Sequence, residues 1–181
     1  MTSSIGEGIV RAFARNTDGN VHIIILGRYR SSADAIIASL PKHENGLYEF
    51  VAVDAVLMRN VAAACTELKT NANGQLQAPL LKINYLVLSQ GAVLFGAPDT
   101  EDGHNPMTAL ALYGRIRAIL ELVSLLEMAS ELGEDGRVMS IGAAGIGGPV
   151  DLSDVGMKKT SYLKLRGALV STVDISILVR S

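Results

Sequence analysis

The stretch Ile83-Asn-Tyr-Leu-Val-Leu-Ser-Gln-Gly91 is the part of this 181-residue chain around which the rest is expected to pack. Its apolar run from Tyr85 to Leu88 shows no polar alternation, and two polar residues and a glycine follow it. Such a run is typical of a strand that helices cover on both faces. In open α/β sheets, ligands collect at the carboxyl ends of these strands. We therefore expect Ser89, Gln90 and Gly91 to line a crevice, or else to form an ordinary turn after a buried strand.

Strands and helices alternate on both sides of this stretch. β-branched and apolar runs predict strands over 21–26, 47–53, 83–88 and 137–141, and apolar residues at helical spacing predict helices over 5–14, 31–40, 56–68, 107–132 and 160–179. This βαβ rhythm indicates an α/β fold with a doubly wound parallel sheet in three layers, α/β/α. With no linker or internal repeat, residues 1–181 are predicted to form a single domain.

The apolar face of the predicted helix over 107–132 is too wide for one contact. We expect one set of its side chains to face the sheet: Leu110, Ile116, Ile119, Leu120, Val123 and Leu126. A second set is expected to face a partner subunit: Leu112, Leu122, Leu125 and Met128.

Composition narrows the classes of function. The net charge of −2 and the lack of a basic block argue against nucleic acid as a partner. Cys65 is the single cysteine, and the three histidines are far apart in the sequence, so neither an internal disulfide nor a structural zinc site is expected. No signal pattern or membrane span is recognisable, so we expect a cytoplasmic protein that does not bind membranes.

Three sites could bind an anion or a nucleotide. The segment Thr2-Ser-Ser-Ile-Gly6-x-Gly8 lies at a predicted helix start, where free N–H groups favour an anion, although a plain helix cap has the same pattern. Arg28 directly follows a strand and could pair with a phosphate, or could be a solvated arginine. Asp54 ends the third strand and could accept hydrogen bonds from a base or ribose, or cap the next helix.

In this order, the pieces resemble the short-chain dehydrogenase/reductase family over essentially the whole chain. The residues Thr2, Ser4, Ile5 and Gly6 resemble the later part of that family's glycine-rich dinucleotide turn. Gly27-Arg28 resembles its cofactor-selecting position, Val53-Asp54 its adenine-contacting acid, and Leu88-Ser-Gln-Gly91 its Asn-Asn-Ala-Gly segment. Arg137 to Gly145 resembles the strand that carries the catalytic serine. The resemblance implies a Rossmann fold and cofactor contacts from Thr2, Ser4, Ile5, Gly6, Arg28, Asp54, Ser89 and Gly91.

The resemblance also implies a catalytic tyrosine with a lysine four residues later, because a phenol needs a nearby cation to exchange protons near neutral pH. Tyr162 is the tyrosine in the right region, but Arg166 stands four residues on and Lys164 only two. Ser140 is the hydroxyl of the preceding strand, although an alignment without gaps places Ala143 at the serine position and Tyr113 at that of an assisting asparagine. The expected catalytic residues are Ser140, Tyr162 and Lys164.

The family's first strand and its last strands have no counterpart in the sequence, which suggests truncation at both ends. Without the first strand, the middle of the sheet has a gap that is closed by rearrangement, by a partner chain, or not at all, and low stability and aggregation are expected. The main functional hypothesis is an oxidoreductase that transfers hydride between NAD(P) and a small carbonyl or alcohol substrate. Arg28 favours NADP, because a guanidinium can pair with the 2′-phosphate.

Two other readings remain open. The first is a cofactor-binding relative without catalytic activity, and the second is a flavodoxin-like or receiver-type domain, for which Asp54 alone supplies an acid at a strand end. Family resemblance also implies a homo-oligomer that pairs through the helices over 107–132 and 160–179.

Overall fold

The computed structural model describes residues 5–92, 97–142, 153 and 176–180. Its elements are α1 (Ile5–Asn16), β1 (His22–Gly27), α2 (Arg30–Ala38), β2 (Leu47–Ala52), α3 (Met58–Thr70), β3 (Tyr85–Leu88), α4 (Pro106–Thr108), the π-helical turn η1 (Ala109–Tyr113), α5 (Gly114–Glu131), β4 (Arg137–Ser140) and β5 (Ser176–Arg180). The strands and helices predicted up to residue 141 are therefore present, with ends that differ by a few residues.

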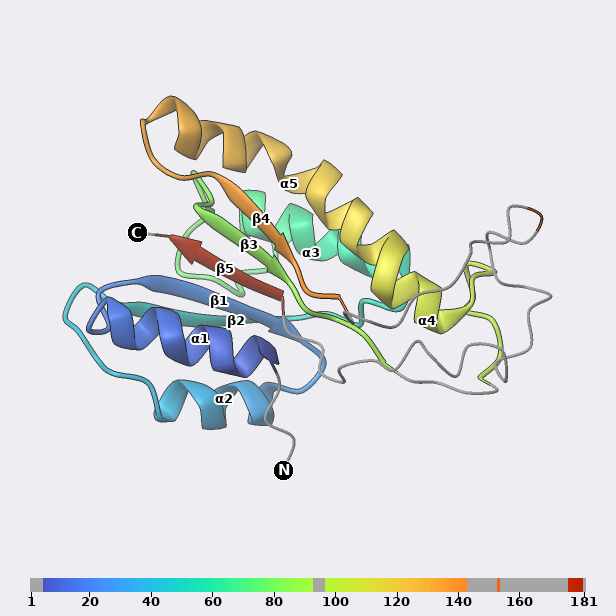
Figure 1. Ribbon diagram of the computed structural model, residues 1–181, viewed down its shortest axis with the longest axis horizontal. Coiled ribbons are helices and arrows are strands. Elements are labelled where there is room, and N and C mark those ends of the chain that lie inside the picture. The colour runs from blue at the N-terminus through green and yellow to red at the C-terminus, as the bar shows by residue number, and fades with distance from the viewer. Residues whose placement is uncertain (1–4, 93–96, 143–152, 154–175, 181) are drawn as a thin grey trace.

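The five strands form one sheet in the order β2-β1-β5-β3-β4 (Figure 1). β1 pairs with β2, and β3 with β4, in the parallel sense that strand–helix alternation predicts. The parallel strands end along one edge of the sheet, which therefore gathers residues 28, 53–54, 89–91 and 140–142. This edge is where ligands bind in open α/β sheets.

β5 corrects the expected helix over 160–179, because residues 176–179 of that range belong to a strand that ends at Arg180; residues 160–175 lie outside the described part. It lies between β1 and β3 and runs antiparallel to both, with Leu178 opposite Ile24 on one side and Leu86 on the other. The sheet is therefore mixed rather than wholly parallel. The gap expected at its centre is closed by the chain's own strand, which is the rearrangement that the sequence left open.

Helices cover both faces of the sheet (Figure 1). Alternate residues of each strand point to opposite faces, so Ile23 and Ile25 pack with α1 and α2, whereas Ile24 and Leu26 pack with α3 and α5. Both cores are almost wholly apolar. The three-layer α/β/α arrangement predicted from the sequence is confirmed.

The long helix meets the sheet through a face that matches the expected one only in part: Leu110 and Leu126 are buried as expected, and Ile119 packs partly buried against the core. The buried residues of α5 are Gly114, Ala118, Leu122, Leu126 and Ala129, and those of η1 are Ala109 and Leu110. Three residues expected to face the sheet, Ile116, Leu120 and Val123, are instead exposed by 46%, 68% and 42%. Leu122, expected at a partner subunit, is buried at 1%.

The π-helical turn η1 explains this rotation of the face. A π-helical turn contains more residues than an α-helical one, so the apolar repeat shifts in register there. At the junction, a Cβ on Gly114 would lie 3.1 Å from the Ala109 oxygen and 3.3 Å from the Ala55 oxygen, which favours glycine at this position. Within the described residues, no helix is both long enough and apolar enough to cross a membrane.

Candidate functional site

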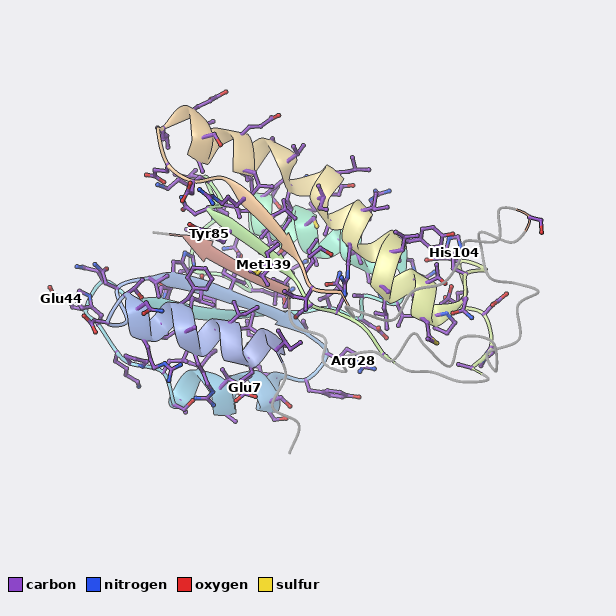
Figure 2. All side chains as sticks on the ribbon, in the orientation of Figure 1. Glu7, Arg28, Glu44, Tyr85, His104 and Met139 are labelled. Carbon is purple, nitrogen blue, oxygen red and sulfur yellow. The ribbon has the colours of Figure 1, made fainter. Side chains whose placement is uncertain are left out.

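A pocket at the ends of β1 and β2 brings together two of the predicted cofactor-binding residues. Arg28 and Asp54 both line this cavity of about 310 Å³, and α3 forms one wall with Asn60 and Ala64. Arg28 lies at the end of the sheet opposite to Glu44 (Figure 2), as expected for the carboxyl ends of the strands. The volume falls within the range of about 300–1,000 Å³ that small-molecule sites usually have.

Asp54 is exposed at the rim of the pocket. One carboxylate oxygen, Oδ1, accepts a hydrogen bond of 3.2 Å from the Val56 amide, and its backbone oxygen accepts one of 3.2 Å from Asn60 Nδ2. The predicted alternative, a cap of the next helix, is wrong, since α3 begins at Met58 and its N-cap residue is Leu57. The amide of Met58 instead donates to Asp102 Oδ2 at 2.8 Å.

A loop over 71–77 closes the pocket from the outer edge of β2. Gln75 Oε1 accepts a hydrogen bond of 3.1 Å from the Ala52 amide, which satisfies a backbone donor on the edge strand. The loop is held by Glu67, which is buried at 1% and accepts hydrogen bonds from the amides of Asn73 (2.8 Å) and Gln75 (2.9 Å). Sequence reasoning missed Glu67 and Gln75, because nothing in the helix pattern indicates that a glutamate points inward.

A second group of polar residues lies at the ends of β3 and β4. Ser89 and Gln90 are each exposed by 3%, and Gly91 is buried, so this turn belongs to the interior of the protein. Leu88 pairs with Ser140, the predicted catalytic serine, at the adjacent strand end. The structure thus brings Ser89 and Ser140 to neighbouring strand ends and places Arg28 and Asp54 across β5 from them.

Arg115, which sequence reasoning missed, joins these two strand ends. Its Nη1 donates to Ser140 Oγ at 2.9 Å and to the Ile141 oxygen at 2.5 Å, and its Nη2 donates to the Gln90 oxygen at 2.6 Å. Because Ser140 Oγ accepts from the guanidinium, its own hydrogen remains available to donate to another group. No pattern in the sequence indicated a role for this residue, since an arginine on a helix usually faces water.

The guanidinium of Arg115 is partly desolvated. Burial lowers its pKa from the ordinary value, and its Nε is buried without a hydrogen-bond partner within the described residues. The three oxygens that it contacts are all uncharged, and none of the ion pairs in the described part of the chain includes it. A positive charge therefore stands uncompensated by any described carboxylate at the ends of β3 and β4.

Several predicted site residues lie outside the described part of the chain. These are Thr2, Ser4, Tyr162 and Lys164. Ile5 and Gly6 open α1, with Ile5 exposed by 50% and Gly6 buried. Within the described residues, no group of three or more His, Cys, Asp or Glu side chains could hold a metal ion.

Several known proteins are similar to this chain in sequence. The chain is 30% identical over 159 residues to Oxidoreductase AN1596 of Emericella nidulans, covering 87% of this chain and 44% of the relative. It is 29% identical over 174 residues to Oxidoreductase andH of Emericella variicolor, covering 94% of this chain and 48% of the relative. The NmrA-like family domain-containing oxidoreductase notO of an Aspergillus species is 26% identical over 160 residues, covering 87% and 45%. The chain thus spans less than half the length of these relatives, and no protein-family model matches it.

Solved structures show the same fold. A bulky-bulky ketone specific alcohol dehydrogenase of Comamonas testosteroni has a TM-score of 0.56 and 15% identity, covering 78% of this chain and 51% of its own. A short-chain dehydrogenase of Sphingobium yanoikuyae, solved in complex with NADPH, has a TM-score of 0.55 and 19% identity, covering 78% and 50%. The short-chain dehydrogenase/reductase fold that the sequence predicted is therefore confirmed.

Proposed function

We propose that this chain, which has the Rossmann-like fold of the short-chain dehydrogenases/reductases, is the cofactor-binding part of an NADP-dependent oxidoreductase that acts on a carbonyl/alcohol pair. Its sequence relatives are named oxidoreductases, and one of the similar structures contains NADPH. The observation that carries the proposal is the pocket at the strand ends, where Arg28 and Asp54 lie together.

The residues of this pocket fit the adenosine end of a nicotinamide cofactor. The guanidinium of Arg28 suits a 2′-phosphate, because its donors match phosphate oxygens in geometry and charge. Asp54 lines the pocket, and its second carboxylate oxygen, Oδ2, could accept from a ribose hydroxyl or a base amine while Oδ1 accepts from the Val56 amide. We therefore favour NADPH over NADH as the cofactor.

The catalytic end of the site would be formed by Ser140, Tyr162 and Lys164. When bound, the nicotinamide ring supplies or accepts the hydride. In our proposal Ser140 donates its free hydrogen to the substrate oxygen, and Tyr162 exchanges the proton that becomes the alcohol hydrogen. Lys164, or Arg166, would lower the pKa of the tyrosine by its positive charge.

A nucleotide titration tests the proposal. Ligand that binds only the folded protein raises the free energy of unfolding, by about 2.7 kcal/mol at one hundred times the dissociation constant. We expect NADPH to raise the melting temperature more than NADH at equal concentration. Arg28→Ala should weaken NADPH binding by about tenfold to a hundredfold, which corresponds to the free energy of one charge-assisted hydrogen bond. The affinity for NADH should stay nearly unchanged.

Arg30→Ala is the matched control, because Arg30 is also an exposed arginine and its ion pair with Asp34 spans 3.8 Å at the surface. It should leave the preference for NADPH intact. If neither nucleotide stabilises the protein, the cofactor site is absent and the proposal is wrong.

A cofactor-binding relative without catalysis remains the second candidate. The observation that favours it is the position of Lys164, two residues after Tyr162, which would place the two side chains apart on a helix. Binding of NADPH without turnover of any substrate in a panel of ketones and aldehydes would support this candidate.

A further inference from the structure

Arg115 brings a positive charge to the ends of β3 and β4 without a described carboxylate to balance it. Its three hydrogen bonds go to the oxygens of Gln90, Ser140 and Ile141, all of them uncharged. By contrast, Arg117, two residues further along α5, pairs with Glu121 at 2.7 Å and is 47% exposed. Arg115 and Arg117 thus lie on the same helix, but among the described residues Arg117 has a nearby counter-charge and Arg115 has none.

The position of Arg115 relative to the nucleotide pocket gives this charge a role. The pocket with Arg28 and Asp54 lies at the ends of β1 and β2, and β5 separates it from β3 and β4. A dinucleotide lies across the carboxyl ends of the strands in an open α/β sheet. If its adenosine phosphate is held by Arg28, its nicotinamide half extends toward Gln90, Ser140 and Arg115.

The two redox states of nicotinamide differ in charge at this end. The oxidised ring is a cation, whereas the reduced ring is neutral, and the phosphates of the two forms are the same. A fixed positive charge in a partly desolvated place therefore disfavours the oxidised ring and leaves the reduced ring unaffected. Two like charges within about 10 Å in such surroundings change the binding constant by about tenfold.

We propose that Arg115 makes the site prefer reduced over oxidised cofactor, so that the chain serves a reductase rather than an alcohol-oxidising enzyme. This inference rests on the proposed function, because it requires the dinucleotide to lie across the sheet as described. Arg115 is in this view a positioning residue: it holds Ser140 and the two strand ends and sets the electrostatic potential at the nicotinamide, without contacting the reacting atoms.

Calorimetric titration with three ligands tests the inference. The ligands are NADPH, NADP⁺ and 2′-phospho-ADP-ribose, the last of which lacks nicotinamide. The wild-type protein should bind NADPH about ten times more tightly than NADP⁺. Arg115→Met removes the charge and should bring the two affinities close together, while the affinity for 2′-phospho-ADP-ribose stays the same.

Two further variants separate charge from shape. Arg115→Lys keeps the charge and should keep the preference for NADPH, and Arg117→Met, the matched control, should behave as the wild type. Where Arg115→Met does not fold, Arg115→Gln takes its place, because its amide can still donate to the strand-end carbonyls.

The results that would overturn the inference differ from those that would overturn the proposed function. Equal wild-type affinities for NADPH and NADP⁺, or an equal loss for all three ligands in Arg115→Met, would leave Arg115 a structural residue only. If 2′-phospho-ADP-ribose does not bind the wild-type protein, the proposed function fails, and the inference fails with it.

Discussion

Cys65 offers a direct readout of the folded state at the scale of a single residue. Its thiol, 2% exposed, lies in the core that α3 and α5 form with the sheet. Burial raises its pKa from the ordinary value of 9.0 to about 12, so the reactive thiolate is scarce in the folded protein. We expect iodoacetamide to leave the native protein unmodified at pH 8 and to alkylate it rapidly in 6 M urea, as mass spectrometry would show.

The same raised pKa makes stability depend on pH in the alkaline range. Below pH 9, the thiol is protonated in the folded and the unfolded chain alike, and its contribution is fully present. As the pH rises toward 12, the unfolded chain ionises first, and the free energy of unfolding falls. Between pH 9 and about pH 10.5, the wild type should lose roughly 2 kcal/mol more than Cys65→Ala in urea titrations. Equal losses would show that Cys65 ionises freely in the fold.

Strand β5 is the feature to test at the scale of the elements. It has hydrogen-bonded neighbours on both sides, so a proline within it removes a ladder bond at the centre of the sheet. Leu178→Pro should therefore release β5 and expose the facing edges of β1 and β3. Hydrogen exchange, followed by mass spectrometry, should become faster over 22–27 and 85–88.

Arg30→Pro is the control for that substitution. Arg30 is the first residue of α2, where a missing N–H is tolerated, and Tyr29 before it has φ −118° and ψ 107°, the extended backbone that a following proline favours. Exchange in β1 and β3 should match that of the wild type. If Leu178→Pro also left their exchange unchanged, β5 would not hold the centre of the sheet in solution.

The elements were predictable from the sequence to the extent that local patterns determine them. The apolar runs of β1, β2 and β3 and the apolar spacing of α2 and α3 predicted both their type and their approximate ends. Residues 176–180 failed this test, because Ile177 and its apolar neighbours fit both a strand and a helical repeat. Whether these residues form a strand or a helix depends on their pairing with β1 and β3, which lie far away in the sequence.

The candidate site was predictable only in part for a similar reason. Arg28 and Asp54 follow strands, so their place at the sheet edge could be predicted from the chain order alone. Arg115 and Glu67 lie on helices, and the side of a helix that faces inward depends on packing. The π-helical turn before Gly114 shifted that side, which the regular helical period could not indicate.

An exposed apolar stripe along η1 and α5 bears on how whole molecules associate. Leu112, Ile116, Leu120 and Val123, spaced three or four residues apart, are exposed by 42–68%. Contiguous apolar patches on a surface commonly mark contacts between proteins. We propose that two copies of the chain pair through this stripe to form the expected homo-oligomer. Leu112 belongs to the set predicted to face a partner subunit, whereas the other three residues of the stripe were expected to face the sheet.

Analytical ultracentrifugation tests this pairing. The wild type should sediment as a dimer, and Leu120→Glu, which puts a charge in the middle of the stripe, should sediment as a monomer. Leu81→Glu is the control, because Leu81 is 69% exposed but lies in a loop and outside the stripe. A monomeric wild type at high micromolar concentration would remove the basis for the proposal.

The antiparallel central strand also has a consequence for the order in which the protein folds. Ile24 meets Leu178 across roughly 150 intervening residues, whereas β1 and β2, or β3 and β4, pair over much shorter separations. Closing so long a loop is entropically costly before any contact forms. The two parallel pairs are therefore expected to assemble first as separate halves, and the last strand joins them in the slow step of folding.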